Sequence, residues 1–518
     1  MSSANARPDG GRSGGRAGGR ASRRAARTQK TIQSLPGLKR RIPPYEMMGE
    51  EGIERIHEAS MQILEQIGID FRDPIALEDW RQAGAEIEGE RVRIPRELLM
   101  SLVAKAPSQY TMHARNAERT VEVGNDNCVF VPSYGAPNVR DLDGNRRYST
   151  LADLHMFHKL AYMSPALHNT GFVSCEPIDL PVAWRHLHIV YSCLSHSDKA
   201  FMGAVTAGER AQDTVDMAKI AFGEEFASNN AVTTSVISCN SPLVWDETML
   251  EAMRIYCRNN QAVLCSPFVL GGASTPASMA VSVAQLNAEA LAGVAYGQIV
   301  RAGCPTLYGN YLSTVSMRSG APMNGTPEVS MMNFIIGQLA RRYDLPWRSS
   351  SMPSGSKLFD AQSGYESATT AMSVLLAGAN YMWHAAGWDE AGMVNDPAKF
   401  VVDAEQCEML YRLASGPRFD DFEEALAAVG EVGPGGHFLG TAHTQEHFQD
   451  AFFMPELFDN NSYEQWAVEG ALDTNARGRA KARQMLVDYQ KPAMDPAIDE
   501  ALLAFIAKRE AEIPENQL

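Results

Sequence analysis

The most constraining feature of this 518-residue chain is an alternation between short apolar runs and longer segments of helical periodicity, from residue 128 to about residue 387. The apolar runs are CVFVPSYG, NTGFVS, KAFMGA, AVTTSVIS, AVLCSPFVL, PTLYGNYL, LPWRSSS and NYMWHAAG. The helical segments between them cover residues 150–163, 183–194, 209–222, 246–258, 278–301, 327–343 and 361–379. Parallel strands require helical crossovers, and eight strand–helix units close into one core. The pattern therefore predicts an α/β protein built on a (β/α)8 TIM barrel.

An open, doubly wound parallel sheet is the main alternative to the barrel. Such a sheet usually has fewer strands, and a glycine-rich phosphate-binding turn often follows the first of them. Here the first run leads into SYGAPN, which is no such turn. Capping patterns support the helical segments, because Thr150 stands three residues before Asp153 and Pro327 precedes Glu328. The barrel is therefore the preferred interpretation.

The sequence on either side of the alternation predicts three further regions. Residues 1–42 are rich in Gly, Arg, Ser and Ala, which cannot bury enough apolar surface to fold, so we expect a disordered basic tail. Residues 43–127 combine an amphipathic helical pattern with short strand-like pieces and predict an N-terminal α+β cap. The barrel itself should cover residues 128–395. Residues 396–518 return to helical patterns broken by loops, and we expect a C-terminal helical extension packed on the barrel.

Charge and hydropathy argue against two classes of partner. Residues 1–41 hold 11 Lys and Arg and a single acid, so the rest of the chain is more acidic than the net charge of −16 indicates. An acidic body is unsuited to nucleic acid, whose phosphates require clustered basic side chains. No apolar run approaches the roughly 18 to 20 residues that span a membrane. The eight cysteines form no CxxC pair, which favours reduced thiols and a cytoplasmic location.

The ends of the eight apolar runs carry the candidate functional residues, because the loops of such a barrel converge where its strands end. A glycosidase would need two facing carboxylates, but the nearest, Glu176 and Asp389, follow distant strands. Aromatic faces beside neutral polar groups instead suit an ammonium ligand that cannot donate hydrogen bonds. The candidates are Tyr134, Tyr308, Asn310, Tyr311, Arg348, His384 and Trp388.

The segment GGHFLGTAHTQEHF offers a competing interpretation. His443 and His447 are four residues apart and can share one helix face, with His437 nearby. Such a pair can chelate zinc, and Glu446 could act as a base. The chain could then be a metal-dependent barrel hydrolase that uses His437, His443 and His447. The pattern is not HExxH, however, and it lies beyond the predicted barrel, so the preferred interpretation includes no metal.

Several segments together resemble the trimethylamine methyltransferase family, a group of corrinoid-dependent barrel enzymes that includes glycine betaine methyltransferases. The resemblance extends from about residue 45 to about residue 490. The segments that carry it are GIDFRDP (68–74), DAQSGYES (360–367), LLAGANYMWHAAGW (375–388) and HFLGTAHTQEHF (437–448) with the MPEL that follows.

The resemblance implies methyl transfer from a methylated amine to the cobalt of a corrinoid on a separate small protein. The corrinoid-carrier signature DxHxxG is only approached at 153–158, where the glycine is missing, so no cofactor should be bound directly and the cobalamin should arrive on a partner. Family members that act on trimethylamine carry pyrrolysine, whereas this chain contains only standard residues. A quaternary amine such as glycine betaine is therefore the expected substrate.

The resemblance and the strand-end positions together give a working picture of the site. Tyr134, Tyr308, Tyr311 and Trp388 would surround the trimethylammonium group. His384 and Asn310, as the catalytic residues, would hold the carboxylate together with Arg348. A betaine-binding barrel without turnover is the remaining alternative. We further expect a homo-oligomer, a small quaternary amine substrate and a corrinoid protein as partner, with no nucleic acid and no membrane.

Overall fold

The computed structural model describes residues 34–515. Most of the predicted basic tail, residues 1–33, lies outside this range. Its last residues, 34–42, are described, and β1 (Leu38–Lys39) pairs antiparallel with β7 (Asn127–Phe130). Leu38 is fully buried and Arg40 donates to the backbone oxygen of Ala379 at 3.1 Å, so these residues pack on the barrel.

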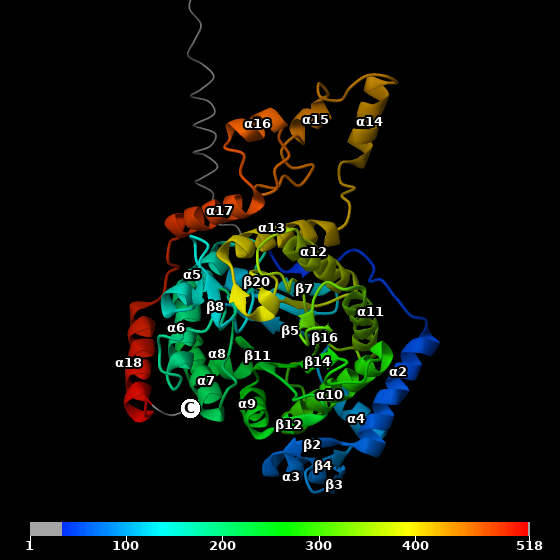
Figure 1. Ribbon diagram of the computed structural model, residues 1–518, viewed down its shortest axis with the longest axis vertical. Coiled ribbons are helices and arrows are strands. Elements are labelled where there is room, and N and C mark those ends of the chain that lie inside the picture. The colour runs from blue at the N-terminus through cyan, green and yellow to red at the C-terminus, as the bar shows by residue number, and fades with distance from the viewer. Residues whose placement is uncertain (1–33, 516–518) are drawn as a thin grey trace, which may run out of the picture.

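A ten-stranded sheet curls into the barrel at the centre of the molecule (Figure 1). Seven of its strands lie parallel in one continuous series, which confirms the predicted fold class. In spatial order the strands are β10 (Phe201–Met202), β11 (Thr233–Ile237), β13 (Ala262–Cys265), β15 (Thr306–Gly309), β18 (Trp347–Ser350), β19 (Tyr381–Trp383) and β7.

The eighth position of the barrel is irregular. The predicted run at 169–174 forms no regular strand, and the cylinder closes through two isolated parallel bridges, Phe130 to Leu167 and Asn169 to Ala200. The His168 ring explains part of the irregularity, because its Nδ1 accepts the hydrogen bond from the Phe130 backbone at 3.1 Å. A side chain thus replaces a carbonyl of the strand ladder at this point.

The predicted helices all form, within a few residues of the predicted bounds. Thr150 and Asp153 make the predicted capping box. The helices around the barrel are α5 (Leu151–Met163), α6 (Arg185–His196), α7 (Gly208–Phe222), α8 (Glu224–Asn229), α9 (Glu247–Arg258), α10 (Met279–Val300), α11 (Pro327–Arg342) and α12 (Ala361–Leu376).

The N-terminal region packs against α10, which is therefore buried around most of its circumference. This region also contains a small sheet of order β12-β2-β4-β3. Its edge strand β12 comes from a loop of the barrel and pairs with β2. The strands β5 and β6 instead extend the barrel sheet beside β7. The elements are α2 (Glu50–Gln62), η1 (Ile63–Ile67), β2 (Ile69–Arg72), α3 (Pro74–Ala83), β3 (Glu86–Glu88), β4 (Arg91–Arg93), α4 (Arg96–Val103), β5 (Gln109–Met112), η2 (Ala117–Arg119), β6 (Val121–Gly124) and β12 (Val244–Asp246).

Two small sheets extend the loops at the carboxyl ends of the barrel strands. One has the order β14-β16-β17, and the other β20-β21-β8-β9. They bring the segments after β13, β15, β19 and β7 together over one end of the barrel. Their strands are β14 (Phe268–Gly271), β16 (Tyr311–Val315), β17 (Pro322–Met323), β20 (Trp388–Asp389), β21 (Val394–Asn395), β8 (Asn138–Arg140) and β9 (Arg146–Tyr148), with the turn η3 (Glu390–Gly392) between β20 and β21.

The C-terminal part of the chain divides between the barrel surface and a projecting lobe (Figure 1). On the barrel lie α13 (Pro397–Ala414), α17 (Thr474–Asp488) and α18 (Pro496–Glu512). Residues 419–472, here called the C-terminal lobe, stand away from it. The lobe contains α14 (Phe422–Val432), α15 (Ala442–Glu446) and α16 (Tyr463–Val468). Among residues 34–515, none of the helices combines the length and apolar character that a membrane crossing demands.

Candidate functional site

Aromatic rings meet where β19 ends at the carboxyl end of the barrel. The His384 ring stacks on Trp388, with ring centres 4.0 Å apart and planes 25° apart. It also stacks on Trp383, with ring centres at 4.6 Å and planes at 20°. The imidazole and the two indoles therefore form one group, which joins the end of a barrel strand to β20. All three side chains come from the short segment 383–388.

Tyr311 and Tyr134 approach this group from two other strand ends. Tyr311, at the start of β16, stands edge-on to both His384 and Trp388, with ring centres at 6.1 and 6.2 Å. Tyr134 stands edge-on to Trp383 at 4.9 Å. Four of the predicted residues, with Arg348 described below, thus gather at one place. We call Tyr134, Tyr311, Trp383, His384 and Trp388 the aromatic cluster.

His384 occupies an unusual backbone conformation, with φ of 56°. This left-handed region is uncommon for residues other than glycine and costs conformational energy. It turns the imidazole into the cluster, where the side chain is only 4% exposed. Nδ1 lies 2.8 Å from the Ser350 hydroxyl, and within the described residues no partner contacts Nε2. Burial, followed by the charge of Arg348, lowers the pKa of His384 well below its ordinary value, so the ring is neutral at physiological pH.

Arg348 is a buried cation without a counter-ion. Its Nη1 donates to the Ser266 hydroxyl at 2.9 Å and to the Asn310 backbone oxygen at 2.6 Å, and its guanidinium lies 4.3 Å from the Trp383 ring centre. Nε has no hydrogen-bond partner among residues 34–515. No carboxylate within the described part of the chain forms an ion pair with it, and burial lowers its pKa to about 9. A buried charge without a partner is costly, so the site is arranged for an anion that the protein itself does not provide.

Tyr308 and Asn310 are not brought into the cluster. The Tyr308 hydroxyl donates to Asn287 of α10 at 2.7 Å, so the side chain lies between the barrel and its helices. The Asn310 side chain accepts from the Trp347 indole at 2.8 Å and faces Asn333 of α11. Only the backbone oxygen of Asn310 contacts Arg348. The structure thus places the Tyr308 side chain away from the cluster, whereas Asn310 lines the small cavity beside it together with Tyr311 and stays a predicted site residue.

Three residues of the site were missing from the sequence-based set: Trp383, Ser266 and Ser350. Trp383 directly precedes His384, and its indole is in contact with both His384 and Arg348. Ser266 and Ser350 hold Arg348 and His384 in place. Each of them stands at the end of a predicted apolar run, which is the signal that identifies it.

The cluster is closely packed in this conformation. The cavity beside it, lined by Tyr311, Asn324 and Ser350 among others, has a volume of about 10 Å³, enough for about one water molecule. A larger hollow of about 510 Å³ lies far from this chemistry, at Tyr463 and Trp466 of the C-terminal lobe. A ligand as large as a trimethylammonium group must therefore displace side chains or the β16 and β20 loops when it enters the cluster.

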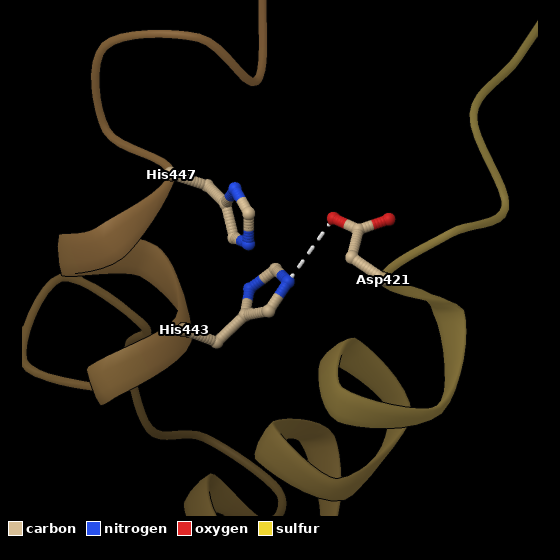
Figure 2. Close-up of side chains that lie close together, drawn as sticks. All are labelled: Asp421, His443 and His447. Atoms are coloured by element: carbon tan, nitrogen blue, oxygen red, sulfur yellow. Dashed lines mark hydrogen bonds and ion pairs between the residues drawn. The ribbon is translucent and has the colours of Figure 1, made fainter.

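The histidines of the competing hydrolase interpretation lie in the C-terminal lobe, not at the strand ends. His443 and His447 group with Asp421 at the start of α14 (Figure 2). His437 is exposed and does not belong to this group. The structure therefore brings His443 and His447 together, as their spacing predicted, but adds Asp421 to them in place of His437. No barrel hydrolase centre is formed by them.

Comparisons with known proteins agree with the barrel fold. The sequence model of the trimethylamine methyltransferase (MTTB) family matches residues 16–514. The chain is 42% identical over 476 residues to the glycine betaine methyltransferase of Desulfitobacterium hafniense (strain Y51). The aligned region covers 92% of this chain and 99% of that relative. It is 26% identical over 475 residues to the proline betaine:corrinoid methyltransferase of Eubacterium limosum, and this alignment covers 88% of this chain and 96% of that relative. The crystal structure of the Methanosarcina barkeri monomethylamine methyltransferase superposes with a TM-score of 0.51 at 10% identity, over 87% of this chain and 90% of that one.

Proposed function

Because the chain belongs to the trimethylamine methyltransferase family, and so is a corrinoid-dependent methyltransferase, we propose that its methyl donor is glycine betaine or a closely similar quaternary amine with a carboxylate. The identity of 42% to a glycine betaine methyltransferase, over almost the whole of both chains, supports this substrate. The absence of pyrrolysine from the sequence supports it as well.

The observation that carries the proposal is the unpaired guanidinium of Arg348 beside the aromatic cluster. Glycine betaine has a carboxylate and a permanently charged trimethylammonium group separated by one methylene. The carboxylate would pair with Arg348 and so remove the cost of its burial. The rings of Tyr311 and Trp388 would attract the cationic end through cation–π contacts, each of which stabilises the complex by about 0.5 to 2 kcal/mol. Trimethylamine has no carboxylate and leaves Arg348 unpaired.

The chemistry of this donor explains why the site contains no acid–base pair. Methyl transfer breaks one N–CH3 bond, and the bonding electrons remain on nitrogen, so dimethylglycine leaves as a neutral amine without a proton transfer. The cobalt(I) of the corrinoid supplies the electron pair of the new Co–CH3 bond. The protein therefore contributes orientation and exclusion of water, which are the roles of a buried cluster that closes around the substrate. A neutral His384 suits this role, because an imidazolium would repel the substrate nitrogen.

Further parts of the proposal concern the partner and the setting. The methyl group would pass to cobalamin carried by a separate corrinoid protein, consistent with a relative whose name specifies a corrinoid acceptor. We also propose a homo-oligomer in the cytoplasm, and the eight buried, free cysteines are consistent with a reducing compartment.

A methyl-transfer assay with a reduced corrinoid protein tests the function. Glycine betaine, choline and trimethylamine are supplied separately, and methyl-cobalamin formation is followed by absorbance. We expect turnover with glycine betaine and at most slow turnover with choline, which has the same headgroup but no carboxylate. Turnover of trimethylamine alone would contradict the substrate assignment. Tight binding of glycine betaine without any methyl transfer would instead support a non-catalytic binding barrel.

A further inference from the structure

The C-terminal lobe has an unusual composition for a folded segment. Residues 419–472 contain eleven Asp and Glu and no Lys or Arg. Only Ala428, Thr441 and Leu457 are buried in it. A segment with this little core and this much like charge needs another source of stability, and small domains commonly use a metal ion.

Three ligand-type side chains converge inside this lobe (Figure 2). Asp421 is the N-cap residue of α14, and His443 and His447 lie four residues apart on and just after α15. One possible ligand atom from each residue lies within 4.8 Å of those of the other two. The two imidazole ring centres are 4.7 Å apart, and both rings turn toward the carboxylate. The cluster therefore joins two helices that are otherwise separated by a glycine-rich loop.

We propose that Asp421, His443 and His447 bind a zinc ion that holds α14 and α15 together. Zn–N and Zn–O bonds of about 2.0 to 2.1 Å in a tetrahedral site place neighbouring ligand atoms roughly 3.3 Å apart. Asp421 Oδ2 and His443 Nε2 are already separated by 3.2 Å. Two imidazoles and one carboxylate are a donor set that zinc prefers, with water in the fourth position.

Neighbouring charges support the same assignment. Asp450 Oδ1 lies 3.5 Å from His447 Nδ1, in the place of the outer carboxylate that commonly orients a metal-binding histidine. Arg418 lies 3.8 Å from Asp421 and 3.4 Å from Asp450, and it is partly exposed, so water screens its repulsion of a cation. The net charge of the lobe attracts a divalent cation.

A second cluster of ligand-type residues in the described chain does not share these properties. Glu54, His57 and Glu58 also lie close together. The His57 ring is hydrogen-bonded to the Tyr343 hydroxyl at 2.9 Å, and the two acids form ion pairs with Arg342 and Arg96. This cluster holds a single histidine, bonded to a buried tyrosine hydroxyl, and both of its acids are ion-paired with arginines, so it serves as an internal comparison and not as a second proposal.

Zinc binding to the untagged, full-length protein tests the proposal. The protein is stripped with a chelator, dialysed against buffered zinc, and analysed for metal by mass spectrometry. We expect about one zinc ion per chain in the wild type and in the control His437→Ala, whose imidazole lies in the same segment but outside the cluster. Asp421→Asn, His443→Ala and His447→Ala should each lower zinc occupancy at least about tenfold. Equal zinc content in all variants, or none in the wild type, would overturn the site.

Limited proteolysis tests the stabilising role and does not depend on methyl transfer. Trypsin is unsuitable because the lobe has no Lys or Arg, whereas chymotrypsin can cut after the exposed Phe448 and Phe452. Zinc should slow this cleavage at least about fivefold in the wild type and not in His443→Ala. Unchanged cleavage in the wild type would refute the role of the ion in holding the lobe together. Because neither readout uses a methyl donor, both results are independent of the proposed substrate.

Discussion

The guanidinium of Arg348 lies 4.3 Å from the centre of the Trp383 ring, and both side chains are almost completely buried. The indole face stabilises the cation, but within the described residues no carboxylate neutralises it. This pair joins the two halves of the proposed recognition: a cation for the carboxylate of the substrate and aromatic faces for its ammonium group.

Replacement of Arg348 by Gln should weaken glycine betaine binding without unfolding the protein. Loss of a buried charge partner costs about 3 kcal/mol or more, so we expect the Kd from calorimetry to rise at least about a hundredfold. The free energy of unfolding, measured with urea, should change by no more than about 1 kcal/mol, because Arg348 has no acid partner to leave unpaired.

Arg254→Gln provides the matched control for Arg348. Arg254 is also buried, but it forms an ion pair with Asp73 at 2.7 Å on the helix side of the barrel. Its removal leaves the buried Asp73 carboxylate without its ion-pair partner, so this variant should lose about 3 to 5 kcal/mol of stability and keep its Kd for glycine betaine. The reverse pattern in the two variants would contradict the role of Arg348.

The ionisation of His384 should not govern substrate binding near neutral pH. Burial and Arg348 lower its pKa, so the neutral form persists through the range in which an ordinary histidine, with a pKa near 6.5, gains a proton. We expect the Kd of the wild type to stay constant between pH 6 and pH 8. His384→Gln should raise the Kd at every pH in this range by a similar factor, because stacking is lost and no titration is removed. A wild-type transition near pH 6.5 that disappears in His384→Gln would refute this account.

A neutral analogue separates the ammonium interaction from the carboxylate interaction. In 3,3-dimethylbutyrate a tert-butyl group replaces the trimethylammonium group, and the carboxylate is unchanged. The wild type should bind glycine betaine roughly tenfold or more tightly than this analogue, because only the cation is attracted by the rings. Trp388→Leu should reduce that preference, whereas Tyr308→Phe should preserve it, since the Tyr308 hydroxyl bonds Asn287 behind the strand. An equal preference in Trp388→Leu and the wild type would exclude the indole from the cation site.

Asp389 should make the protein less stable as pH rises. It is buried beside the cluster, one of its oxygens accepts a hydrogen bond from Ser363, and the other has no hydrogen-bond partner in the described part of the chain. Burial raises its pKa to about 7 from the ordinary 3.8. The folded state therefore holds a proton that the unfolded state releases between pH 4 and pH 7, so this group lowers stability as pH rises through that window. At about 1.4 kcal/mol per pKa unit, the difference amounts to about 4 kcal/mol.

The variant Asp389→Asn isolates this effect. Its free energy of unfolding at pH 8 should exceed that of the wild type by about 2 to 4 kcal/mol, and the difference should shrink toward pH 4. The exposed Asp459→Asn serves as control and should follow the wild type at every pH. A difference that is constant with pH would show that Asp389 is charged in the folded protein.

The barrel could be predicted from sequence because strand and helix periodicities alternate clearly from residue 128 onward. The irregular eighth position could not, since a side chain of His168 replaces a backbone acceptor there. Within the site, the alternation of side chains along β15 and its continuation explains which of the predicted rings meet. Tyr308 contacts Asn287 of α10 and Asn310 contacts Asn333 of α11, whereas the Tyr311 ring contacts His384 at the barrel end, as a period of two requires.

Two other features depend on information that residue patterns do not carry. The left-handed conformation of His384 places its ring and that of the preceding Trp383 in one stack, against the usual alternation. The approach of Asp421 to His443 and His447 depends on how a glycine-rich loop folds back. Neither a short-range period nor a spacing rule identifies such an approach.

Titration calorimetry of the wild type with glycine betaine, choline and dimethylglycine tests the central claim most directly. The account predicts that glycine betaine binds most tightly, that choline binds at least about tenfold more weakly because it leaves Arg348 unpaired, and that dimethylglycine binds more weakly because it lacks the permanently charged nitrogen. If choline bound as tightly as glycine betaine does, or if dimethylglycine bound more tightly than glycine betaine, the result would contradict recognition of a quaternary amino acid by Arg348 and the aromatic cluster.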